Sequence, residues 1–148
     1  MIKKEKNFKN IFYTKFLGIL IKKGKKAKAK KILDTVLSKV SKKTKLTTNF
    51  VLYRVFFNLN TFVEIRRIRS RRRSYLVPFN IKFSRRIFLI LKWVLLAVKA
   101  DVRKISIIDK LALEIYKIVN NLSCTSLKFK ELNNAQAFSN KANIHFRW

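Results

Sequence analysis

The densest group of chemically capable side chains is an arginine cluster near the middle of the chain. From Arg66 to Arg73, six of eight positions are arginine. A guanidinium group donates planar, paired hydrogen bonds to phosphate and keeps its charge throughout the physiological pH range. Two more basic regions occur, one at residues 22–31, where lysine dominates, and one at Arg85 and Arg86. This pattern predicts phosphate binding at several places along the chain.

Side chains that support catalysis are few and scattered. The one histidine is His145, and the seven acidic residues show no paired spacing. Gly18 and Gly24 are the only glycines, so there is no glycine-rich loop of the kind that cradles nucleotide phosphates. The one cysteine, Cys124, excludes an intrachain disulfide and a multi-cysteine zinc site, and we expect it to be a buried thiol. We therefore expect no enzyme activity, catalytic residue, metal site, cofactor or small-molecule substrate.

The net charge limits the kinds of partner. Thirty-six Lys and Arg residues face seven acids, which leaves a formal charge of +29. Most of this charge has no partner within the chain, so we expect a polyanion, either nucleic acid or an anionic membrane surface, to neutralise it. The hydrophobic content of 49% argues against a disordered polycation. The length predicts a single domain spanning residues 1–148.

Hydrophobic periodicity predicts a mainly helical domain of about six helices. Gly24, directly after two lysines, is typical of a helix end, and we interpret residues 22–31 as a basic turn into the next helix. Apolar stripes predict helices over residues 10–21, 27–41, 48–58, 87–98 and 108–122, and a weaker pattern predicts a last helix over 132–148. We expect the 87–98 helix to be central, with Trp93 in the core. With about 12 apolar residues and Lys92 among them, this stretch is too short for a bilayer, which takes about 20.

Two β-rich segments, residues 62–68 and 75–81, flank the arginine cluster. The second alternates between its two faces, which is typical of a strand. We expect a protruding two-stranded β-ribbon arm over residues 62–81, with Pro78 at an edge position. Because an isolated hairpin is marginal in water, its base should pack on helices and its tip should meet a partner. At the start of the following helix the macrodipole disfavours Arg85 and Arg86, so we expect an external anion there.

We expect the polyanion contacts to be basic side chains of these regions and of the carboxyl-terminal segment. Trp148 is an additional candidate for stacking on an unpaired base, with core packing as the equal alternative. The predicted contact residues are Lys22, Lys23, Lys25, Lys26, Lys28, Lys30, Arg66, Arg67, Arg69, Arg71, Arg72, Arg73, Arg85, Arg86, Lys92, Lys128, Lys130, Lys141, Arg147 and Trp148.

Four segments, in order, resemble the universal small-subunit ribosomal protein family numbered seven, in its bacterial and organellar form. They are KFLGILIKKGKKAKAKKILDTVL (15–37), VEIRRIRSRRRSYLVPFNI (63–81), RRIFLILKWVLLAVK (85–99) and the terminal NKANIHFRW (140–148). The last is similar to the family's Asn-Lys-Ala-Phe-Ala-His-Tyr-Arg-Trp. Departures are the mostly missing basic amino-terminal extension, Arg71 and Arg72 in place of Gly-Gly at the ribbon tip, one extra residue after Lys99, and a poor match over 133–139.

The resemblance implies a structural constituent of the small ribosomal subunit. It implies binding to small-subunit rRNA in the 3′ major (head) domain, a part in head assembly, contact with neighbouring head proteins, and proximity to exit-site tRNA and the mRNA path. Lysine, isoleucine, phenylalanine and asparagine are abundant here, as AT-rich codons produce, and this favours an organelle-encoded protein. Its ending at Trp148 resembles mitochondrial members more than plastid ones, so we expect a mitochondrial ribosome, with the plastid ribosome as the alternative.

Two other classes of protein fit part of the pattern. A DNA-binding architectural protein would use basic β-ribbon arms in the minor groove. It would need to be a dimer and to carry an apolar wedge or a proline at the ribbon tip, and neither kind of residue is obvious between Arg69 and Ser74. A peripheral membrane protein would use basic amphipathic helices. The 87–98 helix is apolar on too many sides for an interface, so we expect no membrane partner.

Overall fold

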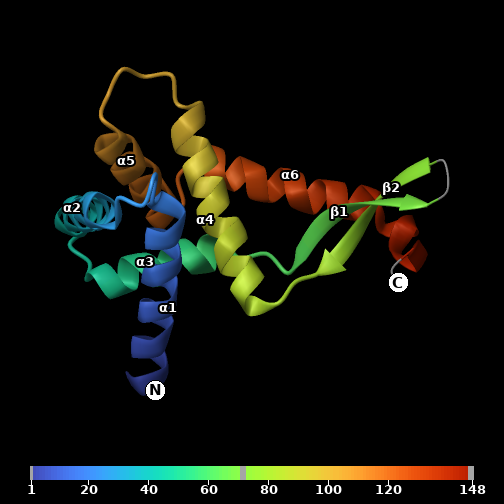
Figure 1. Cartoon of the computed structure of the whole chain (residues 1–148), viewed down its shortest axis with the longest axis horizontal. Coiled ribbons are helices and arrows are strands. Elements are labelled where there is room, and N and C mark those ends of the chain that lie inside the picture. The colour runs from blue at the N-terminus through green and yellow to red at the C-terminus, as the bar shows by residue number, and fades with distance from the viewer. Residues whose placement is uncertain (1, 71–72, 147–148) are drawn as a thin grey trace.

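The computed structural model describes residues 2–70 and 73–146. In this part the chain forms six α-helices, one antiparallel hairpin and a short 3-10 helix (Figure 1). The elements are α1 (Ile2–Leu20), α2 (Lys26–Thr44), α3 (Thr48–Leu59), β1 (Val63–Ser70), β2 (Arg73–Asn80), α4 (Phe83–Ala100), α5 (Ile107–Val119), α6 (Thr125–Ser139) and η1 (Lys141–Phe146). The predicted fold class, mainly α with a two-stranded ribbon arm, is confirmed.

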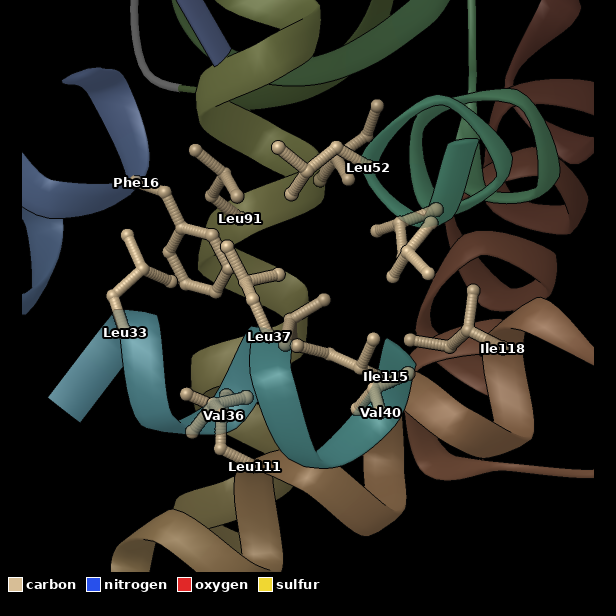
Figure 2. Close-up of a cluster of buried hydrophobic side chains, with 14 of the residues drawn as sticks. Phe16, Leu33, Val36, Leu37, Val40, Leu52, Leu91, Leu111, Ile115 and Ile118 are labelled. Carbon is tan, nitrogen blue, oxygen red and sulfur yellow. The ribbon is translucent and has the colours of Figure 1, made fainter. Parts of the chain in front are cut away.

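The helical body packs around α4, which contacts α1, α3, α5 and α6. Figure 2 shows Leu91 of α4 among side chains from the neighbouring helices, such as Phe16 of α1, Leu33 of α2 and Leu52 of α3, all of which are buried. Full burial of such a side chain contributes about 1.5–3 kcal/mol. The predicted central place of this helix is confirmed, and Trp93 is buried with 8% of its surface exposed.

Several predicted element bounds are wrong, each for a local reason. The basic turn covers only residues 22–25, because Lys23 and Gly24 both take a left-handed φ and α2 starts at Lys26. The helix predicted over 108–122 ends at Val119, because Asn121 takes a left-handed φ of 54° two residues later. Leu122 therefore lies beyond the helix and is exposed.

The last predicted helix, over 132–148, is also wrong in its bounds. The helix α6 begins at Thr125 and ends at Ser139, and a 3-10 helix follows it. Ser126 explains the earlier start, because its backbone N–H and its hydroxyl both donate to Glu114 of α5, at 2.9 and 2.7 Å. The weak apolar pattern of α6 reflects its position, since it leaves the body and runs along the arm (Figure 1).

The arm is an antiparallel ribbon of two strands, each eight residues long. Val63 pairs with Asn80 at its base, and Ser70 pairs with Arg73 towards its tip. Its base is anchored by α6, where the side-chain amide of Asn133 donates to the Val63 carbonyl at 2.8 Å. The predicted packing of the base on helices is thus confirmed.

The carboxyl-terminal 3-10 helix holds the other strand. The Asn143 side-chain amide donates to the Leu76 carbonyl at 3.1 Å, and the Tyr75 and Phe146 rings stack with their centroids 4.3 Å apart. Consecutive carboxyl-terminal segments, α6 and η1, therefore hold one strand of the arm each, across 70 and 67 residues of sequence.

Candidate nucleic-acid interface

The arm presents cations on both of its faces. Arg66, Arg67, Arg69 and Arg73 are exposed, and side chains alternate between faces along a strand, so Arg67 and Arg69 share one face while Arg66 lies on the other. The guanidinium group of Arg66 also lies over the Phe79 ring, 5.3 Å from its centroid and within the range of about 6 Å for a cation–π contact. Arg71 and Arg72 lie outside the described residues.

The arm is joined to α4 by an ion pair that the sequence alone did not indicate. The Arg85 side chain donates two hydrogen bonds to the Glu64 carboxylate, one of them from Nε at 3.0 Å, and Arg66 adds a contact at 3.5 Å. The hydrogen bonds from Arg85 hold the pKa of Glu64 below its usual value, and they raise the pKa of Arg85. Glu64 thus already supplies a counter-charge to Arg85 within the chain, and the external anion expected at this helix start stays a prediction.

Its neighbour Arg86 is also engaged within the chain. Its Nε donates to the Ile81 carbonyl at 3.4 Å, and its guanidinium group lies 4.4 Å from the centroid of the Phe62 ring. Both arginines at the start of α4 therefore position the arm. Glu64 is the only acidic residue between positions 62 and 81, and that isolation is the one sequence signal that could have marked it.

The lysines predicted around the α1–α2 turn are all exposed, but the structure brings only some of them together. Four of these lysines line a common groove together with Lys92 of α4: Lys22, Lys23, Lys25 and Lys28. Lys26 and Lys30 lie on the exposed surface of α2 and do not line this groove. Sequence reasoning missed the groove itself, since its apolar residues belong to the helical stripes.

The carboxyl-terminal candidates differ in their surroundings. Lys128 on α6 and Lys141 on η1 are exposed. Lys130 is turned inward, where its ammonium group donates to the Asn58 carbonyl at 2.7 Å, and burial lowers its pKa. This contact joins α6 to the end of α3, so Lys130 has a structural partner already. Arg147 and Trp148 lie outside the described residues.

The acidic side chains are largely used inside the protein. Asp101 pairs with Arg103, Asp109 pairs with Lys39, and Asp34 accepts a hydrogen bond from Tyr13. In the described part of the chain only four basic side chains take part in ion pairs. The remaining exposed lysines and arginines of the described residues form no ion pair with a carboxylate, and a surface of this kind attracts polyanions.

The described residues include no group of three or more His, Cys, Asp or Glu side chains that could hold a metal ion. None of the helices in residues 2–70 and 73–146 has the length and apolar character needed to cross a membrane. Cys124 is buried, as expected, and burial raises the pKa of its thiol.

The fold and the charge distribution define a class of protein: a small, strongly basic helical domain with a β-ribbon arm, whose surface suits an extended polyanion. Residues 1–141 match the family model described as ribosomal protein S7p/S5e. The chain belongs to this ribosomal protein family.

Curated relatives agree over nearly the whole length. A protein of Mesorhizobium japonicum named small ribosomal subunit protein uS7 is 31% identical over 147 residues, which cover 99% of this chain and 93% of the relative. Proteins of the same name from Syntrophus aciditrophicus and Rickettsia canadensis are 32% and 31% identical, over 95% and 94% of this chain and 89% and 86% of their own lengths. The resemblance inferred from four sequence segments is confirmed.

Proposed function

We propose that this protein is a structural constituent of the small ribosomal subunit and binds small-subunit rRNA. One observation carries the proposal: five of the seven acidic side chains are engaged within the protein, while most exposed cations form no ion pair in the described part of the chain. RNA carries one phosphate per nucleotide and can neutralise such a surface over a long path. Membership in the ribosomal protein family supports the same role, and so do the names of the relatives as small ribosomal subunit proteins. Its role is binding and assembly, without catalysis.

The arm and the lysine turn are the two regions to which we assign the RNA contacts. The arm offers Arg67 and Arg69 on one face, and hydrogen bonds from α6 and η1 hold its two strands at Val63 and Leu76. Arginine forks suit phosphate oxygens, whereas the lysines of the turn act as mobile point charges. Fixed and mobile cations would thus contact different parts of the same RNA.

The finer assignment follows the family resemblance. It places the contacts in the 3′ major (head) domain of the rRNA, gives the protein a part in head assembly beside neighbouring proteins, and puts it near exit-site tRNA and the mRNA path. We further propose a mitochondrial ribosome, with a plastid ribosome as the alternative, and the support for this is the amino-acid usage of the chain. The similar proteins cited above are bacterial.

The direct test is to isolate native particles that contain this chain and to sequence the RNA that accompanies it. The proposal predicts small-subunit rRNA at an equimolar level, with release of the protein after ribonuclease treatment. Crosslinking within the particle would show whether the arm reaches head-domain rRNA or tRNA. Recovery of the folded protein without polynucleotide, or with duplex DNA, would contradict the proposal.

A further inference from the structure

A groove lies between the α1–α2 turn and α4, apart from the arm. The end of α1, the turn, the first part of α2, the outer face of α4 and the start of α5 form it, and its volume is about 790 Å³. Its floor is mainly aliphatic, with one aromatic ring, and in the described part of the chain no acidic side chain lines it. The floor residues that matter here are Ile32, Phe88, Leu95, Leu96 and Ile107.

Lysines border this floor from two sides. The turn and α2 contribute one set and α4 contributes the other, and all of them are exposed and outside the ion pairs of the described residues: Lys22, Lys23, Lys25, Lys28, Lys92 and Lys99. A seventh lysine, Lys110, already donates its ammonium group to the Asp101 carbonyl at 2.7 Å. The groove is therefore an apolar surface with uncompensated cations of the turn, α2 and α4 around and among its floor residues.

A nucleotide outside a helix matches this arrangement. It offers a flat, weakly polar base face and a phosphate on each side of it. In a continuous duplex both faces of each base are covered by neighbouring bases, so a base can reach the floor only where it is unpaired and extruded. The groove is open to solvent, which leaves the polar base edges free to meet water or lysine.

The end of the groove near the arm provides a stacking platform. Phe88 lines the groove with 36% of its surface exposed, and the Arg85 guanidinium group lies 5.1 Å from the centroid of its ring. Aromatic rings and arginine planes are the surfaces on which unpaired bases stack in single-stranded nucleic-acid sites.

An acidic amphipathic peptide would also match an apolar floor with a basic rim. RNA is favoured because exposed, unpaired cations are not confined to the groove: Lys26 and Lys30 of α2 do not line it, so the counter-charge has to extend past the apolar floor. A phosphate chain extends in this way, whereas a helix docked in the groove would end there.

We propose that the groove binds an extruded nucleotide of the bound RNA, with its base on the apolar floor and its flanking phosphates on the lysine rim. This inference rests on the proposed RNA-binding function and adds selectivity for bulged or looped RNA over continuous duplex.

The test compares two RNA duplexes of equal length that carry a fluorescent adenine analogue, either bulged or paired. The full chain should bind the bulged probe about tenfold more tightly, because stacking contributes about 1–3 kcal/mol per base, and the fluorescence should be quenched on binding. Leu96→Asn should abolish the preference. The matched control is Leu132→Asn, since Leu96 and Leu132 are exposed leucines on helices, at 38% and 57%, and only the first lines the groove.

The outcomes separate this inference from the function on which it rests. Tight but equal binding of both probes, or a preference that survives Leu96→Asn, would overturn the groove proposal and leave RNA binding in place. Absence of binding to either probe and to small-subunit rRNA would overturn both. Displacement of the bulged probe by an acidic amphipathic peptide, with no fluorescence change on RNA binding, would identify a protein-docking groove and overturn the nucleotide proposal.

Discussion

Glu64→Gln tests how the arm is held to the body. The substitution keeps the size of the side chain but removes the charge that faces Arg85 and Arg66. Hydrogen bonds to charged groups contribute about 1.5–3 kcal/mol, whereas exposed ion pairs contribute about 0.2–1 kcal/mol. The Glu64 side chain is 12% exposed and the Arg85 side chain 44%. Solvent therefore screens the charge of Glu64 less than that of Arg85, and the interaction energy should lie between these two ranges.

We therefore expect the free energy of unfolding to fall by about 1–2 kcal/mol. For a domain of this size, the midpoint of thermal unfolding should fall by about 2–8 °C. Urea denaturation followed by circular dichroism measures the first quantity, and a thermal scan measures the second. Glu131→Gln is the matched control, because it makes the same charge change at an exposed site of α6, and its effect should stay within about 0.5 kcal/mol.

The pH dependence of stability tests whether the ionised form of Glu64 is the stabilising one. The pKa of Glu64 is lowered in the folded protein, chiefly by the hydrogen bonds from Arg85, so the ionised form is the stabilising one. Its contribution is complete above the unfolded pKa and is lost as the pH falls through the folded pKa. The unaltered protein and Glu64→Gln should thus converge in stability at acidic pH. Equal stability at neutral pH, or a difference that Glu131→Gln reproduces, would refute this account of the arm.

Two further predictions concern the arm arginines and the hydroxyl of Tyr13, a partly buried side chain. Replacing Arg67, Arg69 and Arg73 with alanine should leave helical circular dichroism unchanged and should make the salt dependence of rRNA binding shallower by about 2–3 in log–log slope; loss of helicity would make the cluster structural instead. Desolvation, and to a smaller extent the hydrogen bond that the Tyr13 hydroxyl donates to Asp34, raises the pKa of Tyr13 to about 12. An ultraviolet titration should therefore show a late ionisation step that Tyr13→Phe removes, and the stability contribution of this group should be lost as the pH rises through about 12. A late step that persists in Tyr13→Phe would contradict this assignment.

The elements with strong periodicity could be predicted from the sequence. Apolar stripes are local, so α4 and the buried position of Trp93 follow from spacing alone. The ribbon was predictable for the same reason, since its two β-rich segments flank a polar tip. The start of α6 was not, because it depends on hydrogen bonds between Ser126 and Glu114 on another helix.

The candidate site was predictable as a set of residue types but not as an arrangement. Charge counting identified Arg85 and Lys130, yet the structure engages Arg85 with an acid 21 residues away and Lys130 with a carbonyl 72 residues away. Such pairings depend on the tertiary fold. The groove was invisible for the same reason, because Leu96 and Ile107 become neighbours of the lysines only after the helices pack.

The central claim is that phosphates neutralise the cations that the fold leaves unpaired. The most direct measurement is the affinity of the full chain for a small-subunit rRNA fragment over a series of salt concentrations. If about ten phosphates are contacted, the logarithm of affinity should fall against the logarithm of salt with a slope of about −7 to −9. A slope shallower than about −2 would contradict the claim, because it would mean that only two or three phosphates are contacted.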